Sequence, residues 1–511
     1  MSRLRLTLKN GWIALVFQLA YIVTQFFSRN IFLEYLGDDF VGTEGTLKSI
    51  LMFLNLSELG IGTAVGFALY KPLFNKDREK INELIGYLGY LYKRIGLFVL
   101  LGGVVLILFF PLFFDDEKVN IGIVIFLFLA LLTSNLINYF FTYHMFLLEA
   151  DQRGYINTTI NRSTYILKLV VQCFVLIYLE NIIVWISIEL LSAFLYALIF
   201  RKRIRKAYPW LHLKFEVTQP IKERNRSLLT KIKQISFHKL GSFVSTGTDN
   251  ILIFALINPA TVAYVGNYQM VMNNINILVS KLFEGTKAGV GNLVAENNLK
   301  NTLKVFWEMM ALRFFFAGSA SLVMYIGFDD FIILWLGEKY ILSETILLAL
   351  VAIFFILQIR QPVDDFKQAY GLFDDIWSPV VQSVLNLILS VVLVLEYGII
   401  GVFIGTIVSQ VAIVLIWRPY FLFTSGMKIS SRVYWKGFLM HLIYLSIAGL
   451  LFLMASRNFD MSKNTGIFEL LVHLIQLGMF FSCIYFLILL ALSKGFRHVV
   501  NRFYGIIKNK L

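Results

Sequence analysis

Residues 120–146 read NIGIVIFLFLALLTSNLINYFFTYHMF, a stretch that contains no acidic side chain, no lysine and no arginine. A helix rises about 1.5 Å per residue, so about 20 apolar residues cross the hydrocarbon of a bilayer, which is about 30 Å thick. This stretch is therefore predicted to cross a membrane as a helix. Apolar runs of similar length recur along the whole chain, and they predict an all-α integral membrane protein.

The composition agrees with this prediction. The 511 residues are 58% hydrophobic and only 15% charged, and the mean hydropathy is +0.73. These values lie far from those of soluble globular domains. The sequence predicts about fourteen transmembrane helices, at residues 11–32, 46–70, 90–113, 120–146, 156–179, 182–200, 236–257, 262–281, 305–327, 345–363, 378–396, 398–417, 436–455 and 466–492.

The net charge of +14 first raises the possibility of a nucleic-acid partner. With the predicted helices in place, however, 40 of the 46 Lys and Arg residues fall on the side of the two termini. Cytoplasmic loops of membrane proteins carry such an excess of positive charge. Both termini are therefore predicted to be cytoplasmic, and no nucleic-acid partner is expected.

The longest predicted cytoplasmic connection divides the chain after six helices. It begins with RKRIRK at residues 201–206, a run that is typical of the basic flank of a membrane helix, although an anionic-lipid or nucleic-acid patch has the same composition. Six helices follow it, and then a final pair. The predicted parts are an N-terminal six-helix lobe (1–200), a basic linker (201–235), a C-terminal six-helix lobe (236–425) and two additional helices with a cytoplasmic tail (426–511).

Several polar side chains lie inside the predicted helices. The stretch STGTDNILIF at residues 245–254 contains Asp249, and an ionised side chain at the bilayer centre costs about 2.5 to 3.5 kcal/mol on insertion scales. Amides lie beside it and on the next helix, among them Asn250, Gln269 and Asn273. These groups either join helices through hydrogen bonds or line a hydrated cavity, and the cavity explains the acid as well as the amides.

Other candidates carry charge. Arg29, Lys168 and Arg313 lie within predicted helices, and Glu58 lies about midway through the second one. Arg29 and Arg313 are close enough to a helix end to reach lipid headgroups instead.

The stretch LQIRQPVDDFKQAYG at residues 357–371 places Arg360 close to Pro362 and two aspartates. Proline lacks a backbone donor and is predicted to interrupt the helix at this point, unless the stretch is only a helix end at the cytoplasmic face.

No motif for enzymatic chemistry is present. The sequence contains no G-x-x-x-x-G-K-[ST] phosphate loop, no H-E-x-x-H and no C-x-x-C, and none of the six histidines is at metal-ligand spacing. We therefore expect no catalytic residues, no metal site and no cofactor. Any energy is expected to come from an ion gradient, the membrane potential or consumption of a product.

Several segments in order resemble the polysaccharide repeat-unit flippases, the O-antigen and capsule exporters of the multidrug/oligosaccharidyl-lipid/polysaccharide exporter superfamily. The resemblance covers about residues 10–420. It is carried by SRNIFLEYLGDDFVG (28–42), LLEADQRGYINTTI (147–160), STGTDNILIF (245–254), YVGNYQMVMNNI (264–275), LQIRQPVDDFKQAYG and LNLILSVVLVLEYGIIGVFIGTIVSQ (385–410).

The resemblance implies two six-helix lobes around a central cavity, with two extra C-terminal helices, that alternate between inward-open and outward-open states. The implied substrate is a polyprenyl-pyrophosphate-linked oligosaccharide, moved to the periplasmic leaflet of the bacterial cytoplasmic (inner) membrane. A polysaccharide polymerase and assembly proteins are possible partners besides membrane lipid. Two alternatives are a cation-coupled multidrug exporter of the same superfamily and a membrane polysaccharide polymerase or ligase.

Roles for the candidate residues follow from the chemistry of that substrate. A pyrophosphate needs cations or amide donors, and sugar hydroxyls need polar partners. We expect substrate contacts from Arg29, Lys168, Arg313, Arg360, Asn250, Gln269 and Asn273. Acids repel pyrophosphate, so Asp249 and Glu58 are expected to act in gating or to bind a coupling cation, H⁺ or Na⁺.

Overall fold

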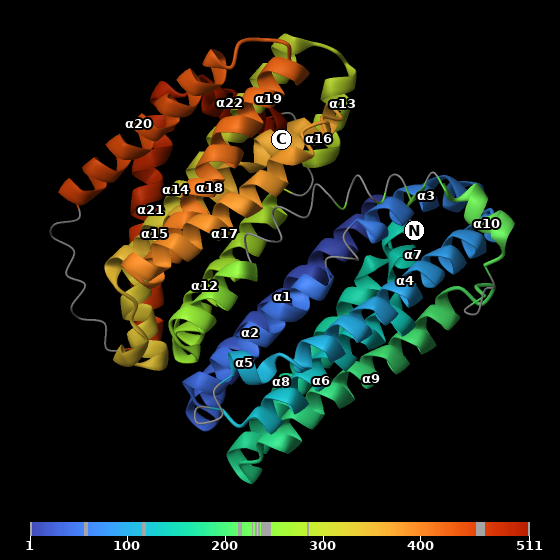
Figure 1. The fold of residues 1–511 in the computed structure, drawn as a ribbon. Helices are drawn as coiled ribbons and strands as arrows, with labels where there is room; N and C mark the ends of the chain where they lie inside the picture. The colour runs from blue at the N-terminus through green and yellow to red at the C-terminus, as the bar shows by residue number, and fades with distance from the viewer. Residues whose placement is uncertain are drawn as a thin grey trace. The chain divides into compact units, whose positions relative to one another are not determined.

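The computed structural model describes residues 3–55, 60–114, 119–212, 217–226, 228–229, 232, 236, 247–283, 286–455 and 466–508. Within these ranges the chain forms helices joined by turns, and no strand occurs there. The chain divides into two compact units, Met1–Ala263 (unit 1) and Tyr264–Leu511 (unit 2), whose helices are drawn in Figure 1. The predicted all-α membrane fold is thereby confirmed.

Each unit has its own set of helices. Unit 1 contains α1 (Arg3–Leu36), α2 (Asp38–Leu54), α3 (Ile61–Asn75), α4 (Arg78–Ile107), α5 (Phe110–Phe113), α6 (Ile121–Ile137), the π-helical turn η2 (Asn138–Thr142), α7 (Met145–Ala150), α8 (Gly154–Leu179), α9 (Ile182–Ala207), α10 (Gln219–Arg224) and a helix at Gly247–Leu256. The helix α12 (Pro259–Leu282) begins in unit 1 and continues in unit 2. Unit 2 further contains α13 (Thr286–Ala295), α14 (Leu299–Leu336), η3 (Glu338–Tyr340), α15 (Glu344–Ile359), α16 (Gln361–Ala369), α17 (Trp377–Tyr397), α18 (Ile399–Gln410), η4 (Val411–Trp417), α19 (Arg418–Phe421), η5 (Leu422–Gly426), α20 (Arg432–Ala455), α21 (Ile467–Leu492) and α22 (Lys494–Lys508).

Eleven helices in the described ranges are long and apolar enough to cross a membrane, and each coincides with one of the fourteen predicted spans. The other three spans differ for separate reasons. The span 46–70 is divided between α2 and α3, and residues 237–246 of the span 236–257 lie outside the described residues. The span 262–281 is the helix α12, whose many asparagines lower its hydropathy. The lobe boundaries predicted from the sequence differ from the boundary between the two compact units. The predicted lobes are not tested by that boundary and stay predictions.

Short polar residues fix where several helices begin. Asp77 accepts a hydrogen bond from the backbone of Lys80 at 3.0 Å and caps α4. Asn120, Asn181 and Asn298 cap α6, α9 and α14 in the same way. A side chain oxygen at this position satisfies one of the backbone donors that a helix leaves free at its N-terminus.

In unit 2 the helices α17 and α18 form a tight hairpin. Gly398 makes the turn at a φ of 64°, and a Cβ at Gly401 or Gly405 would meet the backbone of α17. The close approach lets the Asn386 amide donate to Thr406 Oγ1 at 2.7 Å. Small residues with a buried hydrogen bond are a common way to pack helices inside a membrane.

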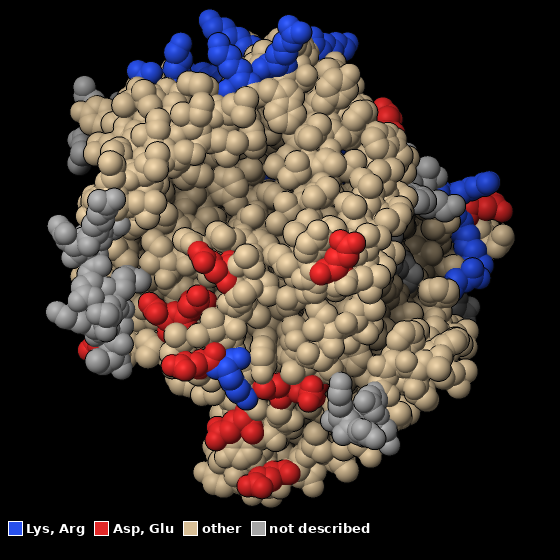
Figure 2. Space-filling model, turned by 60° about the vertical axis from the view of Figure 1, so that its left-hand side comes forward, with Lys and Arg blue, Asp and Glu red and all other residues tan. Residues whose placement is uncertain are grey.

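The charges on the surface are segregated. Figure 2 shows one face on which Lys and Arg side chains gather at one end, while most Asp and Glu side chains lie toward the other. The orientation predicted from the loops, with the basic side in the cytoplasm, stays a prediction.

The first part of the predicted linker is bound to unit 1. The Tyr208 hydroxyl donates to Asp151 at 2.7 Å, and the His212 backbone amide donates to the Asn82 side chain at 2.8 Å. Glu83 on α4 accepts from the Asn225 amide at 2.8 Å and pairs with Arg224 at 3.0 Å. The linker up to Asn225 is therefore part of unit 1.

We expect Glu83→Ala to increase tryptic cleavage after Arg224 by about tenfold, because the substitution removes two charge-assisted contacts of α10. The rate is measured on the purified full chain under native conditions. Glu79→Ala is the control, since Glu79 is an exposed carboxylate in the first turn of the same helix. Equal cleavage rates in the two variants would show that Glu83 does not hold the linker.

Candidate functional site

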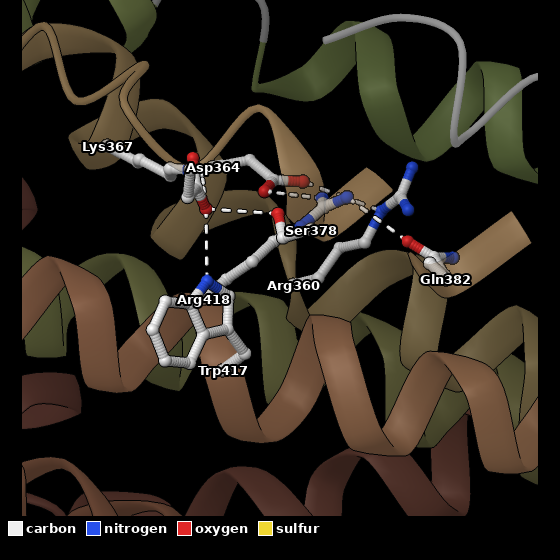
Figure 3. Close-up of polar contacts among 8 residues, drawn as sticks. Arg360, Asp364, Lys367, Ser378, Gln382, Trp417 and Arg418 are labelled. Atoms are coloured by element: carbon white, nitrogen blue, oxygen red, sulfur yellow. Dashed lines mark hydrogen bonds and ion pairs between the residues drawn. The ribbon is translucent and has the colours of Figure 1, made fainter. Parts of the chain in front are cut away.

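In unit 2 the membrane helix at residues 344–369 is interrupted, and charged residues gather at the interruption. The helix α15 ends at Ile359 and α16 begins at Gln361, so Arg360 lies between them and Pro362 occupies the first turn of α16. The interruption predicted from Pro362 is confirmed. We use the name unit 2 cluster for Arg313, Gln358, Arg360, Asp364, Asp365, Lys367, Asp375 and Arg418, most of which are drawn in Figure 3.

Two arginines of the unit 2 cluster share one carboxylate. Arg418 donates to Asp364 Oδ1 at 2.9 Å and to Gln382 at 3.3 Å. The Arg360 Nε lies 3.6 Å from Asp364 Oδ2, which is too far for a hydrogen bond, and this Nε donates to no other group in the described ranges. The Arg360 side chain is nevertheless only 15% exposed. Arg360 is thus a mostly buried cation whose negative partner is already bound to another arginine.

A second ion pair in the unit 2 cluster is fully bonded. The Lys367 ammonium donates to both oxygens of Asp375, at 2.5 and 2.6 Å. The same carboxylate accepts from the Ser378 hydroxyl at 3.0 Å and from the Trp417 indole at 3.2 Å (Figure 3). Asp375 is 1% exposed and connects α16, α17 and η4.

Arg313 on α14 makes mainly neutral contacts. It donates to Gln358 at 2.8 Å, and Gln358 in turn donates to Asn276 of α12 at 2.5 Å. The guanidinium carbon lies 3.9 Å from the centre of the Phe283 ring, and Asp365 attracts Arg313 electrostatically.

The unit 2 cluster carries a positive surplus. It contains four cations, Arg313, Arg360, Lys367 and Arg418, and three carboxylates, Asp364, Asp365 and Asp375. Because Asp364 and Asp375 are engaged by Arg418 and Lys367, the surplus is concentrated at Arg360. A buried surplus charge is costly without a counter-ion, so the arrangement suits an anionic ligand.

Unit 1 has its own row of polar side chains, on the facing sides of α1, α8 and α9. Lys168 donates to both oxygens of Glu189, at 2.8 and 3.1 Å, and its ammonium lies 4.1 Å from the centre of the Tyr165 ring. Lys168, one of the predicted anion contacts, is thus already neutralised by a carboxylate of α9.

Arg162 lies nearly two helical turns before Lys168 on α8 and contacts neutral groups. It donates to the Gln18 side chain oxygen at 3.1 Å, and its guanidinium carbon lies 4.3 Å from the centre of the Tyr21 ring. The Tyr21 ring in turn lies 5.2 Å from that of Tyr165. We use the name unit 1 row for Gln18, Tyr21, Arg162, Tyr165, Lys168 and Glu189. The unit 1 row also has a positive surplus, since it contains two cations, Arg162 and Lys168, and one carboxylate, Glu189.

The remaining predicted residues that the structure describes lie on α1, on the helix at Gly247–Leu256 and on α12. Arg29 donates to the carbonyl oxygen of Ala263 at 3.0 Å, and Asn250 donates to the Ser49 hydroxyl at 3.1 Å. Both contacts join residues 247–263 to α1 and α2. Asp249 is buried, Gln269 is half-buried and Asn273 is exposed. Glu58 lies outside the described residues. The roles expected of these residues remain predictions.

Sequence reasoning did not single out Arg162, Lys367 or Arg418. A signal for Arg162 was available, because Arg162, Tyr165, Lys168 and Gln172 recur at the three- and four-residue spacing of one helix face. Lys367 and Arg418 follow the ends of two predicted membrane helices, where basic residues are common. Their carboxylate partners lie on other helices, so no local pattern points to them. Within the described ranges, no three His, Cys, Asp or Glu side chains lie together in a way that could hold a metal ion.

The arrangement of the helices corresponds to a known membrane-protein fold. The chain has the fold of the multidrug/oligosaccharidyl-lipid/polysaccharide exporter superfamily, a multi-pass membrane fold. No family model matches the sequence, and no curated protein matches it.

The particular structures that the chain resembles are those of membrane transporters. The lipid II flippase MurJ in an inward closed conformation matches with a TM-score of 0.66 and 15% identity, over 93% of this chain and 99% of MurJ. An inward-facing multidrug resistance MATE family transporter of the same superfamily matches with a TM-score of 0.61 and 13% identity, over 82% of this chain and 99% of that one. The Vibrio cholerae MATE transporter VcmN matches with a TM-score of 0.54 and 16% identity, over 80% of this chain and 95% of VcmN. At these identities the likeness concerns the fold.

Proposed function

We propose that this protein is a flippase that moves polyprenyl-pyrophosphate-linked oligosaccharides from the cytoplasmic to the periplasmic leaflet of a bacterial inner membrane by alternating access. The observation that carries the proposal is the positive surplus inside the membrane helices of both units. In unit 2 the carboxylates of Asp364 and Asp375 are bonded to Arg418 and Lys367, and Arg360 is left with a contact of 3.6 Å. In unit 1 Arg162 contacts Gln18 and Tyr21.

A pyrophosphate-linked glycan suits this surplus. Arginine binds phosphate oxygens through two parallel N–H donors, and the contact strengthens where water is scarce. Arg360 is the best candidate for this role, since its guanidinium is mostly buried and its carboxylate is shared. The amides of Asn250, Gln269 and Asn273 and the half-buried Tyr21 and Tyr165 can bind sugar hydroxyls, and the polyprenyl tail can remain in lipid.

The likeness to MurJ supports the same choice. MurJ is named as a lipid II flippase, and its match extends over 93% of this chain, compared with 82% for the first MATE transporter. The matched proteins are transporters, which supports a function without catalysis. A polysaccharide polymerase or ligase is therefore the less favoured alternative.

Cation-coupled multidrug export is the second candidate. The buried Asp249 favours it, because an intramembrane acid can bind a proton or a sodium ion. Glu58, which lies outside the described residues, is a second acid that the sequence places within a predicted membrane helix. We propose that in a flippase these acids couple transport to H⁺ or Na⁺ or bias the direction in which the protein opens. The cation surplus opposes a cationic drug and favours an anionic headgroup.

A transport assay separates the two candidates. The full chain is reconstituted into vesicles with a fluorescent polyprenyl-pyrophosphate oligosaccharide, and a membrane-impermeant reductant is added outside. We expect the reductant to quench the probe of both leaflets when the protein is present and only that of the outer leaflet when it is absent. A parallel assay follows efflux of a cationic dye. Dye transport without quenching of the inner-leaflet probe would replace the flippase with a drug exporter.

A further inference from the structure

The helix α22 directly follows the apolar helix α21. It begins at Lys494, two residues after the membrane helix α21 ends at Leu492, and it runs to Lys508. Its sequence, KGFRHVVNRFYGIIK, places basic and apolar residues on different sides of a helix. A helix that follows a membrane crossing at such short distance stays within reach of the lipid headgroups.

One side of α22 is packed against unit 2. Phe496 is 3% exposed, and its ring lies 5.2 Å from that of Phe486 on α21 and 5.7 Å from that of Phe315 on α14. Gly495 lies against the backbone of Trp307, where an added Cβ would come 2.6 Å from the carbonyl oxygen. Phe496 and Val499 on the apolar side of α22 are therefore buried against protein, whereas Lys494 and Arg497 are exposed.

An ion pair fixes the orientation of α22. Arg502 donates to Glu308 of α14 at 2.7 Å, and the Glu308 side chain is only 4% exposed. A buried carboxylate needs such a partner, so Glu308 favours the one rotation of α22 that brings Arg502 to it. In that rotation Lys494 and Arg497 are exposed.

Further basic residues surround this helix. The N-terminal parts of α20 and α22 approach the same residue, since Gly437 of α20 packs against the Trp307 ring and Gly495 of α22 packs against its backbone. Exposed lysines and arginines stand at the nearby ends of α14 and α20. We use the name α22 basic surface for Lys300, Lys304, Arg432, Lys436, Lys494 and Arg497.

We propose that the α22 basic surface binds the phosphate headgroups of anionic phospholipids in the cytoplasmic leaflet, and that the Arg502–Glu308 pair positions α22 for this contact. All six residues of the surface carry positive charge, and anionic headgroups are the complementary charge. The position of α22 directly after a membrane crossing favours a lipid over a soluble partner. The inference depends on the membrane fold and is independent of the transported substrate.

Native mass spectrometry of the detergent-solubilised full chain tests the proposal. The protein is titrated with phosphatidylglycerol and, separately, with phosphatidylcholine of the same acyl chains. We expect tighter binding of phosphatidylglycerol, and we expect Lys494→Gln/Arg497→Gln to weaken it by about 25-fold, because each of the two basic residues near a membrane surface contributes on the order of fivefold. The matched control is Lys202→Gln/Arg203→Gln, which removes two exposed charges from the end of α9 in unit 1.

Three outcomes would overturn the proposal. The first is equal binding of the two lipids by the unaltered chain, and the second is an equal loss of affinity in the control and the α22 variant. The third is tighter binding of a short single-stranded oligonucleotide than of phosphatidylglycerol.

For the positioning pair, we expect Arg502→Ala to increase hydrogen exchange in α22 and Arg502→Lys to restore protection. No change in exchange in Arg502→Ala would remove Arg502 from the proposal.

Discussion

Replacing Asp375 with alanine is expected to destabilise the protein by about 3 to 5 kcal/mol, because the substitution leaves the Lys367 ammonium buried without its counter-ion. The Asp375 side chain is 1% exposed and accepts hydrogen bonds from Lys367, Ser378 and Trp417. One substitution therefore removes bonds that join α16, α17 and η4. The loss is measured as a decrease in the thermal unfolding midpoint of the purified chain in detergent.

The neighbouring residue provides the control. Asp374 is an exposed carboxylate at the adjacent position, so Asp374→Ala changes the net charge equally without removing a buried pair. We also expect Lys367→Met to restore part of the stability of Asp375→Ala, since the double variant has no unpaired charge at this site. Unfolding midpoints that coincide for Asp374→Ala and Asp375→Ala would mean that the ion pair does not hold these helices together.

The membrane helices could be predicted from the sequence because hydrophobic length alone decides whether a helix can cross a bilayer. The span at 120–146, for example, returns as α6 with η2 over Ile121–Thr142. Two features of the fold could not be predicted from hydrophobic length alone. Span 46–70 divides between α2 and α3, and α12 is a long helix whose polar side chains give it low hydropathy.

The partners of the charged residues could not be predicted in the same way. Lys168 and Glu189 were visible as separate charges in two predicted helices, but their pairing depends on how α8 packs against α9. Arg418 has the sequence context of an ordinary basic flank, yet it binds a carboxylate 54 residues earlier in the chain. Long-range packing thus decides which intramembrane charges are neutralised. Lys168 is neutralised by Glu189, whereas Arg360 keeps a charge that can contact an anion.

Replacing Arg360 with glutamine is expected to lower the rate of lipid-linked oligosaccharide transport by about 10- to 100-fold, the range that corresponds to the loss of charge-assisted hydrogen bonds to a phosphate. The unfolding midpoint is expected to change little, because Arg418 already satisfies Asp364 and Arg360 contributes only the contact at 3.6 Å. Arg360→Lys keeps the charge but loses the two-donor geometry, so its transport rate should lie between those of Arg360→Gln and the unaltered chain.

Arg418→Gln is the matched control because it removes the same group from the same carboxylate. Arg418 donates to both Asp364 and Gln382, so we expect this variant to lose stability together with transport. The unfolding midpoint then distinguishes the two arginines: it should stay near that of the unaltered chain in Arg360→Gln and fall in Arg418→Gln. If Arg360→Gln instead lowers the unfolding midpoint and transport in parallel, Arg360 acts in packing, and the anion contact in unit 2 must be sought at Arg313.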